Sequence, residues 1–302
     1  MNTLLIKLGA LGDVVRTTPL LRVLPGKVTW VADRAAHPLL PREPLDALLT
    51  LPEASALRGR RFDLVLSLDE DREAAALASS VEAGRLEGTY LGSDGGLRYT
   101  DGSAGWFDMS LISRLGRERA DSLKRRNGRT YQDLVFAMLG RRFSGEEYWI
   151  APAARRREPG RPLRVGLDGR AGPRWPMKRW GGFPALARRL EADGLRVQLF
   201  RQRARLQDFR ADIAACDLVV CGDTLTMHLA LALGIRTVAL FLCTSPYEIH
   251  GYGRLVKVAS PLWKDYAYAR GRGREPGEAL GVAEVHAQVR RLCARTAPAA
   301  CP

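Results

Sequence analysis

Apolar and polar positions along the first half of the chain alternate in blocks that predict strands and helices in turn. Apolar runs predict buried strands at residues 3–8, 27–33 and 62–71. Amphipathic or Ala-rich stretches predict helices at residues 13–24, 73–83 and 130–140. Pro25 and Gly26 end the first helix, and Thr130 suits the N-cap of the last. This order predicts a parallel sheet with helices on both faces.

Two stretches interrupt the pattern. Residues 89–128 are Gly-rich and weakly periodic, which predicts a binding loop or a mobile excursion. Residues 151–162 have the Pro, Gly and Arg content of an exposed interdomain linker, and a long surface loop within one domain is the alternative.

After this second stretch the alternation begins again. Strands are predicted at residues 163–169, 195–200, 217–222 and 236–242. Helices are predicted at residues 183–193, 206–216 and 226–234, and a final amphipathic helix is marked by Val282, Val285, Val289 and Leu292. A length of 302 residues fits two α/β domains. We expect these at residues 1–157 and 158–280, followed by a helix and tail at 281–302.

Composition narrows the class of protein. The chain is 46% hydrophobic and 26% charged, as in a soluble globular protein, and has no apolar run of about 18 residues and no signal-peptide pattern. Its five cysteines have no metal-binding spacing, which favours reduced thiols in a cytosolic protein. The net charge is +14, and only six of the 47 basic residues are Lys. Either a GC-rich genome favours Arg, or the surface attracts anions; because the Arg residues are spread out, nucleic acid is disfavoured.

A glycine turn, Gly9-Ala10-Leu11-Gly12, follows the first predicted strand, and Asp13 comes next. Such a turn brings backbone N–H groups and a helix start to the sheet edge, where an anion or substrate can approach closely. The turn lacks the third glycine of a dinucleotide fingerprint and the GK[ST] of a P-loop. By itself, it leaves Asp13 as either a helix-stabilising carboxylate or a catalytic group.

Polar groups also follow strands in the second half. Within residues 173–183, Lys178 lies among other cations and tryptophans, where it can neutralise a diphosphate or form part of a solvated basic loop. Asp223 and Thr224 follow a buried strand, as caps or ligand groups, and His228 on the next helix is a core histidine or a ligand group. The Thr244 hydroxyl, after the next strand, suits a phosphate or a sugar.

Four segments together resemble glycosyltransferase family nine, the ADP-heptose:lipopolysaccharide heptosyltransferases and their relatives. They are KLGALGDVVRTTPLLRVL, KRW, DLVVCGDTLTMHLALALG and VALFLCTSPYEIHGYGR. The segments span most of the chain, and their order and spacing make the resemblance specific. It implies an α/β fold of the GT-B type, in which two Rossmann-like domains with parallel sheets face a cleft. It also implies inverting transfer without a metal or another cofactor.

The resemblance assigns roles to individual residues. It makes Asp13 the general base that takes the acceptor proton and Lys178 the group that holds the donor diphosphate. The donor-binding positions are Lys178, Asp223, Thr224, Leu225, His228 and Thr244. The acceptor, or an anion, would meet Gly12, Arg16 and Thr17. The N-terminal domain then binds the acceptor, the second domain binds the nucleotide sugar, and the last helix crosses back to the first domain.

Three departures from the family pattern bear on these roles. Leu225 stands where the family usually has glycine after the Asp-Thr pair. After residues 195–200, one helix and one strand of the family are missing, together with the carboxylate that they supply to the nucleotide ribose. The cysteines that some relatives carry after the YGR segment are also missing, which disfavours a metal finger there.

The sequence therefore predicts a cytoplasmic enzyme that moves a heptose from an ADP-heptose-type donor. The acceptor is a lipopolysaccharide core sugar or a small molecule. The net charge of +14 also suits a peripheral contact with the anionic surface of the inner membrane. The alternative is a nucleotide-sugar-binding protein that has lost catalysis.

Overall fold

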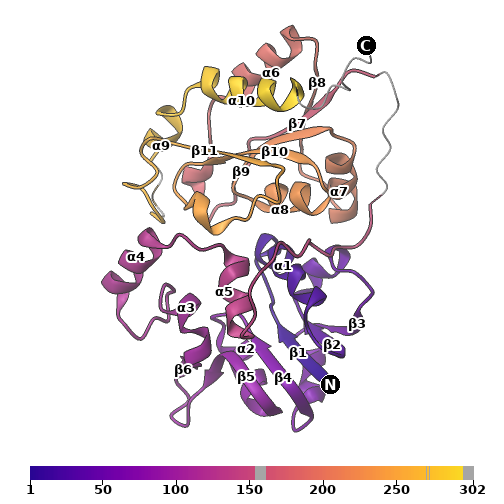
Figure 1. Cartoon of the computed structure of the whole chain (residues 1–302), viewed down its shortest axis with the longest axis vertical. Helices are drawn as coiled ribbons and strands as arrows, with labels where there is room; N and C mark the ends of the chain where they lie inside the picture. Colours follow the sequence, from indigo (N-terminus) through magenta and orange to yellow (C-terminus); the bar gives the residue numbers. More distant parts are fainter. Residues whose placement is uncertain (154–160, 270, 272, 295–302) are drawn as a thin grey trace. The chain divides into compact units, whose positions relative to one another are not determined.

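The computed structural model describes residues 1–153, 161–269, 271 and 273–294. The chain divides into two compact units, coloured in sequence order in Figure 1. Unit 1 comprises Met1–Ala151 and Tyr247–His250, and unit 2 comprises Pro152–Pro246 and Gly251–Pro302. Most of the expected linker lies outside the described residues.

Unit 1 is built on a six-stranded sheet with the order β3-β2-β1-β4-β5-β6. Its strands are β1 (Asn2–Ile6), β2 (Lys27–Val31), β3 (Leu45–Leu49), β4 (Arg61–Ser67), β5 (Glu82–Leu91) and β6 (Leu97–Tyr99). The first five strands of this order are parallel, and β6 pairs antiparallel with β5. Because Ile6 lies opposite both Val31 and Ser67, the carboxyl ends of β1, β2 and β4 meet at one edge of the sheet.

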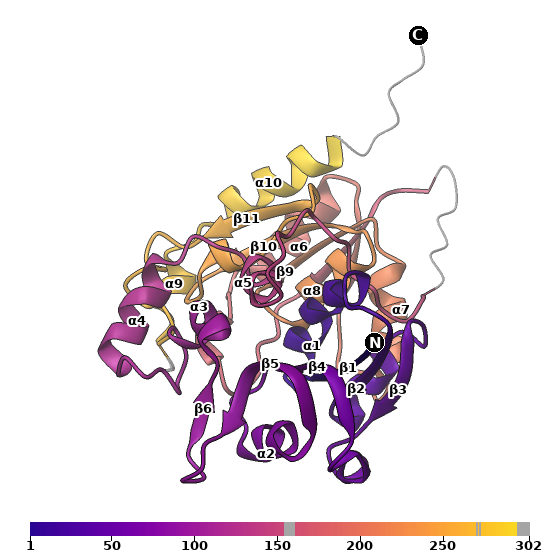
Figure 2. The ribbon, with the colours of Figure 1, turned by 60° about the horizontal axis from the view of Figure 1, so that its bottom comes forward.

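Helices cover both faces of this sheet. They are α1 (Leu11–Thr17), α2 (Arg72–Ser80), α3 (Ala104–Phe107), α4 (Arg117–Arg126) and α5 (Tyr131–Met138), with the 3₁₀ helices η1 (Thr18–Arg22), η2 (Arg34–Leu39), η3 (Glu53–Leu57) and η4 (Asp101–Ser103). Figure 2 shows α2 on the face of the sheet opposite α1 and α5. Leu4 and Ile6 pack with Leu77 of α2 because alternate strand residues point to one face.

The helix expected at residues 13–24 is shorter than predicted. It ends at Thr17, and residues Thr18–Arg22 form η1 instead. Pro19 has no N–H to continue the α-helical hydrogen bonds, and the Thr18 hydroxyl donates to the Val15 carbonyl at 2.7 Å. The α-helix therefore gives way to the tighter helix at the threonine–proline step.

Residues 89–128, expected to be a loop or a mobile excursion, instead contain regular elements. β5 and β6 form a hairpin around a turn in which Asp94 accepts a hydrogen bond from the Gly96 N–H at 2.9 Å. Three short helices follow, and the ring of Phe107 packs 5.4 Å from that of Tyr99. These elements are too short to produce a clear periodic pattern.

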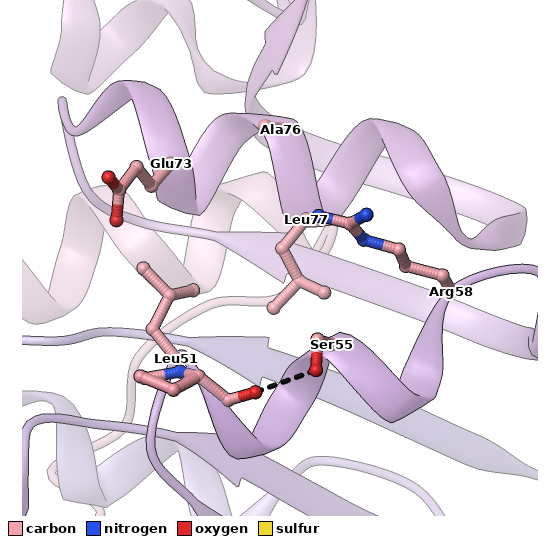
Figure 3. A pocket seen from close by; sticks show the side chains of 7 residues that line it. Leu51, Ser55, Arg58, Glu73, Ala76 and Leu77 are labelled. Atoms are coloured by element: carbon pink, nitrogen blue, oxygen red, sulfur yellow. Dashed lines mark hydrogen bonds between the residues drawn. The ribbon is translucent and has the colours of Figure 1, made fainter.

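A cavity of about 350 Å³ lies between η3 and α2 in unit 1 (Figure 3). Its lining is Leu51, Pro52, Ser55, Arg58, Glu73, Ala76 and Leu77. None of these is a predicted site residue, and the cavity lies on the α2 side of the sheet. We therefore assign it no part in the chemistry discussed below.

Unit 2 holds a five-stranded parallel sheet with the order β11-β10-β9-β7-β8. Its strands are β7 (Arg164–Asp168), β8 (Arg196–Leu199), β9 (Leu218–Gly222), β10 (Arg236–Phe241) and β11 (Leu255–Ala259). Its helices are α6 (Phe183–Ala192), α7 (Leu206–Ala214), α8 (Leu225–Ala232), α9 (Glu275–Glu278) and α10 (Val282–Ala294), with the 3₁₀ helices η5 (Pro176–Lys178) and η6 (Pro246–Glu248). In Figure 1, α6 and α10 lie on one face of this sheet, and α7 and α8 lie on the other.

Two features of unit 2 concern the sequence predictions. β8 lies at the edge of the sheet and leads through residues 200–205 directly into α7, so the described chain has no further strand beside β8. The last helix, α10, places Val285, Val289 and Leu292 in the core of unit 2. Its apolar side therefore packs in unit 2.

Candidate active site

The glycine turn of unit 1 connects β1 directly to α1. The N-cap of α1 is Ala10, and Asp13 is the third residue of the helix. Its backbone N–H donates to the Ala10 carbonyl at 2.8 Å. A Cβ atom on Gly9 would stand 2.9 Å from the Asp33 carboxylate, so a larger residue there would require this side chain to move. Asp13 thus lies in the first turn, where the helix dipole favours a negative charge, but it is not the N-cap.

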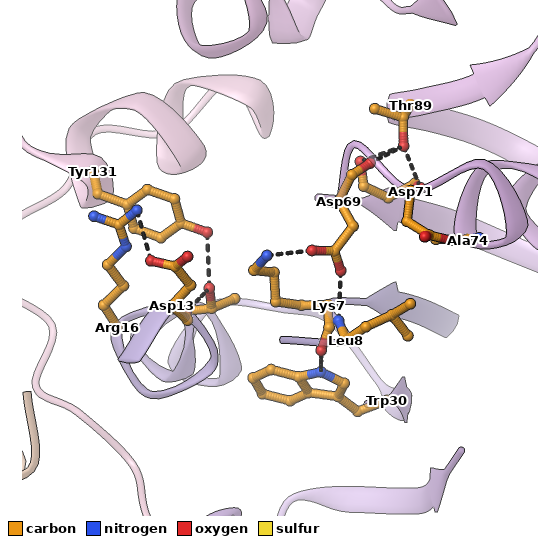
Figure 4. A network of polar contacts seen from close by, with 12 residues as sticks. Lys7, Leu8, Asp13, Arg16, Trp30, Asp69, Asp71, Ala74, Thr89 and Tyr131 are labelled. Carbon is orange, nitrogen blue, oxygen red and sulfur yellow. Dashed lines mark hydrogen bonds and ion pairs between the residues drawn. The ribbon is translucent and has the colours of Figure 1, made fainter. Parts of the chain in front are cut away.

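Arg16 holds the Asp13 carboxylate from one turn further along α1. The guanidinium lies 2.9 Å from Asp13 Oδ1, and the side chains are 11% and 40% exposed, respectively (Figure 4). Arg16 stacks on the ring of Tyr131, 4.1 Å from its centroid, and Trp106 lies on the same cation at 5.5 Å. An aromatic floor of this kind restrains the arginine, and through it the carboxylate.

The other two predicted acceptor positions differ in accessibility. Gly12 is partly exposed in the first turn of α1. Thr17 is fully buried, and its hydroxyl donates to the Asp13 carbonyl at 2.7 Å and lies 2.8 Å from the Tyr131 hydroxyl. Thr17 therefore ties α1 to α5 inside unit 1.

Sequence reasoning missed a buried ion pair beside Asp13. Lys7 follows β1, Asp69 follows β4, and the Lys7 ammonium donates to the Asp69 carboxylate (Figure 4). Asp69 also accepts from the Leu8 N–H. The signal for this pair in the sequence is Lys7 itself, the one charged residue in the apolar run 3–8.

In unit 2, three of the predicted donor-binding residues form one cluster. The Lys178 ammonium donates to the Asp223 carbonyl at 2.8 Å and to its carboxylate at 2.7 Å. The Thr244 hydroxyl donates to the same carboxylate oxygen at 2.8 Å. Lys178 comes from η5, Asp223 follows β9, and Thr244 follows β10. The fold therefore joins three segments that follow strands at one point.

Electrostatics fix the charge of this cluster. Burial works against the ionised form of Asp223, but the charges of Lys178 and His228 and the two hydrogen bonds outweigh it and lower the Asp223 pKa to about 2. Asp223 is therefore an anion at neutral pH. An ammonium has three N–H donors, and Lys178 uses two of them on Asp223. The third can serve an anionic ligand.

The remaining donor-binding predictions lie at the start of α8. Thr224 is its N-cap, but makes no side-chain capping bond; its hydroxyl donates to the Gly222 carbonyl at 3.4 Å. Leu225 is the first residue of the helix, and His228, its fourth residue, is buried. The helix start thus lies directly beside the Lys178–Asp223 pair.

A further polar group at the end of β7 was not predicted. Asp168 is buried and accepts hydrogen bonds from Arg170 and from the Thr226 hydroxyl of α8. Arg170 also contacts Gln202, beyond β8, at 3.3 Å. The region after β8 thus offers the Gln202 amide, and Arg170 engages the carboxylate of Asp168.

The described residues contain no group of three or more His, Cys, Asp or Glu side chains placed to hold a metal ion. No helix in that part of the chain has the length and apolar content to cross a membrane. The four described cysteines are free thiols, and Cys301 lies outside the described residues.

Comparison with known proteins gives a match in the second half of the chain. Residues 202–269 match the model of glycosyltransferase family 9 (heptosyltransferase). This segment includes Asp223, Thr224, Leu225, His228 and Thr244. No curated protein matches the chain.

Solved structures share the fold over nearly the whole chain. A family 9 glycosyl transferase from Veillonella parvula DSM 2008 has a TM-score of 0.67 at 16% identity, covering 97% of each chain. The E. coli ADP-heptose LPS heptosyltransferase II has a TM-score of 0.61 at 16% identity, covering 99% of this chain and 100% of its own. E. coli heptosyltransferase WaaC, solved with ADP-2-deoxy-2-fluoro heptose, has a TM-score of 0.57 at 15% identity, covering 88% and 97%.

These likenesses confirm the predicted fold class, an α/β fold of the GT-B type with parallel sheets. The family match confirms the predicted resemblance and the predicted transferase class. The match over residues 202–269 and the shared fold together make the chain similar to glycosyltransferase family 9, the heptosyltransferase family.

Proposed function

We propose that the chain transfers a heptose from an ADP-heptose-type donor to an acceptor hydroxyl with inversion, and that Asp13 is the general base. The observation that carries this proposal is the Asp13 carboxylate, 40% exposed at the end of a glycine turn and held by Arg16 at 2.9 Å. A fixed, accessible carboxylate beside a turn of small residues is what a hydroxyl acceptor requires.

The proposed step is a direct displacement. Asp13 takes the proton of the acceptor hydroxyl as its oxygen forms a bond to the anomeric carbon. The bond from that carbon to the donor phosphate breaks on the opposite face, and ADP leaves with the electron pair. Attack opposite the leaving group inverts the anomeric centre.

Unit 2 supplies the groups for the leaving diphosphate. Lys178 brings a buried ammonium with one remaining donor, and the start of α8 brings backbone N–H groups beside it. The anionic Asp223 limits the net charge of this cluster, because it neutralises Lys178 before the donor binds. WaaC and TibC, two neighbours in fold, have been solved with ADP-heptose compounds, which supports a donor of this class.

For the acceptor, we propose an anionic molecule, because the chain carries a net charge of +14. A phosphorylated core sugar of lipopolysaccharide and a phosphorylated small molecule share this chemistry. The free thiols support a reaction in the cytoplasm. A contact with the anionic inner membrane would follow if the acceptor is a lipid-linked sugar.

The test replaces Asp13 with Asn, which keeps the shape and removes the base. We expect ADP release from ADP-heptose, with a panel of both acceptor types, to fall by about 10²- to 10⁴-fold. Asp46→Asn is the matched control, because Asp46 is half-exposed on β3 and pairs with the surface residue Lys27 at 3.6 Å. A folded Asp13→Asn variant with wild-type transfer would refute the base assignment.

A second measurement separates the enzyme from a binding protein without activity. Calorimetry with ADP-heptose, GDP-sugars and UDP-sugars reports which nucleotide sugar the chain holds. Binding of ADP-heptose with transfer to one acceptor supports the proposal. Binding with no transfer to any acceptor, and with no effect of Asp13→Asn, points to the binding protein.

A further inference from the structure

The pair formed by Lys7 and Asp69 is buried at the edge of the sheet that carries the proposed base. Lys7 is 6% exposed, and the Asp69 side chain is 12% exposed. They follow the neighbouring central strands β1 and β4, whose registers align Ile6 with Ser67. A buried ion pair on two central strands costs desolvation energy, so its presence calls for a reason other than stability alone.

The surrounding backbone holds both residues in place. The Lys7 carbonyl accepts from Trp30 Nε1 at 3.2 Å, and the Asp69 carbonyl accepts from the Thr89 hydroxyl at 2.7 Å. The Leu8 N–H donates to the Asp69 carboxylate as well. The carboxylate is thus bound from two sides and fixes the direction of the lysine.

Lys7 also interacts with the Asp13 carboxylate. Burial, the largest influence on the Lys7 pKa, lowers it, yet the charges of Asp69 and then Asp13 outweigh burial and leave the pKa raised. In the view of Figure 4, the ammonium lies between these two carboxylates. One cation therefore serves two anions, of which only Asp13 is substantially open to solvent.

Charged and titratable groups interact with Asp13 from several elements of unit 1. They are Arg16 on α1, Lys7 after β1, Asp69 after β4 and Tyr131 on α5. The neighbouring 3₁₀ helix η2 and its N-cap add Asp33, Arg34 and His37. Arg34 bonds to Glu53, and His37 contacts the Ala32 carbonyl. Lys7 and Arg16 are thus both cations that interact with Asp13.

We propose that Lys7 and Asp69 are positioning residues for the base: the Lys7 ammonium favours the ionised form of the Asp13 carboxylate, and Asp69 orients that ammonium and offsets its charge. This inference rests on the proposed role of Asp13. Less positive charge would make Asp13 harder to ionise, and more positive charge would make it a weaker base. The Lys7–Asp69 pair therefore holds the base strength of Asp13 between these two limits.

The inference predicts shifts of opposite sign for two isosteric variants. Lys7→Met removes a cation and should move the titration midpoint of Asp13 up by about one pH unit. Asp69→Asn removes an anion and should move the midpoint down. The double variant Lys7→Met/Asp69→Asn should return the midpoint to near that of the wild type. A merely structural role predicts no such pattern.

The direct readout is carbon-13 NMR of protein labelled in its aspartate carboxyl groups. The Asp13 signal is identified by its loss in Asp13→Asn. Lys27→Met and Asp46→Asn, in the exposed pair of the same sheet, are the matched controls and should leave the midpoint unchanged. The acid limb of the kcat/KM profile should follow the same shifts. If Lys7→Met alone fails to fold, Asp69→Asn and the double variant carry the test.

The outcomes distinguish this inference from the proposed function. Opposite shifts in folded variants support it. Shifts in the same direction, or none, overturn it, and the loss of transfer in Asp13→Asn would still leave the base role standing. If Asp13→Asn transfers sugar at the wild-type rate, the base role fails, whatever the NMR midpoints show.

Discussion

The Lys178–Asp223 pair allows a prediction with a worked magnitude. Asp223→Asn keeps the shape of the side chain but removes the charge that faces Lys178 at 2.7 Å. Both side chains are largely buried, with exposures of 14% and 15%. Because the ammonium is then left in the interior without its carboxylate, we expect a loss of about 3 kcal/mol in the free energy of unfolding at neutral pH.

Part of this loss depends on pH. The Asp223 pKa is lowered from 3.8 to about 2 in the folded protein. That difference corresponds to about 2 kcal/mol of stability. Because the folded pKa is the lower one, this stability is present above the unfolded value of 3.8 and is lost as the pH falls through about 2. The variant has no such carboxyl group.

The assay is urea unfolding of the wild type and Asp223→Asn, followed by circular dichroism between about pH 5 and about pH 2. The stability difference between the two proteins should shrink by about 2 kcal/mol over this range. Asp46→Asn, in an exposed pair, is the control and should change far less. A difference between wild type and Asp223→Asn that stays constant across the range would refute this reasoning.

Two further predictions concern the donor site and α5. Lys178→Met should weaken the binding of ADP by about tenfold or more, because a charge-assisted hydrogen bond contributes about 1.5–3 kcal/mol. Calorimetry measures this affinity, and Lys264→Met, at an exposed lysine, is the control. An affinity equal to that of the control would exclude Lys178 from the diphosphate site. Thr130→Ala should lower the free energy of unfolding, measured in urea, by about 1 kcal/mol, because Thr130 and Asp133 form a capping box at the start of α5. An unchanged midpoint of urea unfolding would show that the cap is dispensable.

The predicted elements succeed where a pattern is local. The apolar runs at β1, β7 and β9 have residues buried on both faces, so nearly every position is apolar. The N-cap at Thr130 is confirmed because capping involves only the next three residues. Prediction is poorer at residues 89–128, because the β5–β6 hairpin and the helices after it are short and depend on packing such as the contact of Tyr99 with Phe107.

The candidate site also combines features that the sequence predicts with contacts that depend on packing. The order of motifs along the chain is enough to single out Asp13, Lys178 and Asp223. The bond between Lys178 and Asp223 joins residues 45 positions apart, and the one between Lys7 and Asp69 joins residues 62 positions apart. The local sequence does not predict that these side chains meet. In the sequence, Lys7 is notable only as the one charged residue in an apolar run.

The sequence by itself therefore determined the alternation of strands and helices, the glycine turn ahead of Asp13 and the polar groups that follow the strands. These depend on the preferences of neighbouring residues. Only the tertiary structure decided that Asp13 is the third residue of its helix, that Thr17 is buried, and that Lys178 and Lys7 each pair with a distant carboxylate. The reason is physical: burial and ion pairing depend on which strands lie side by side, and strand order is set by packing over the whole sheet.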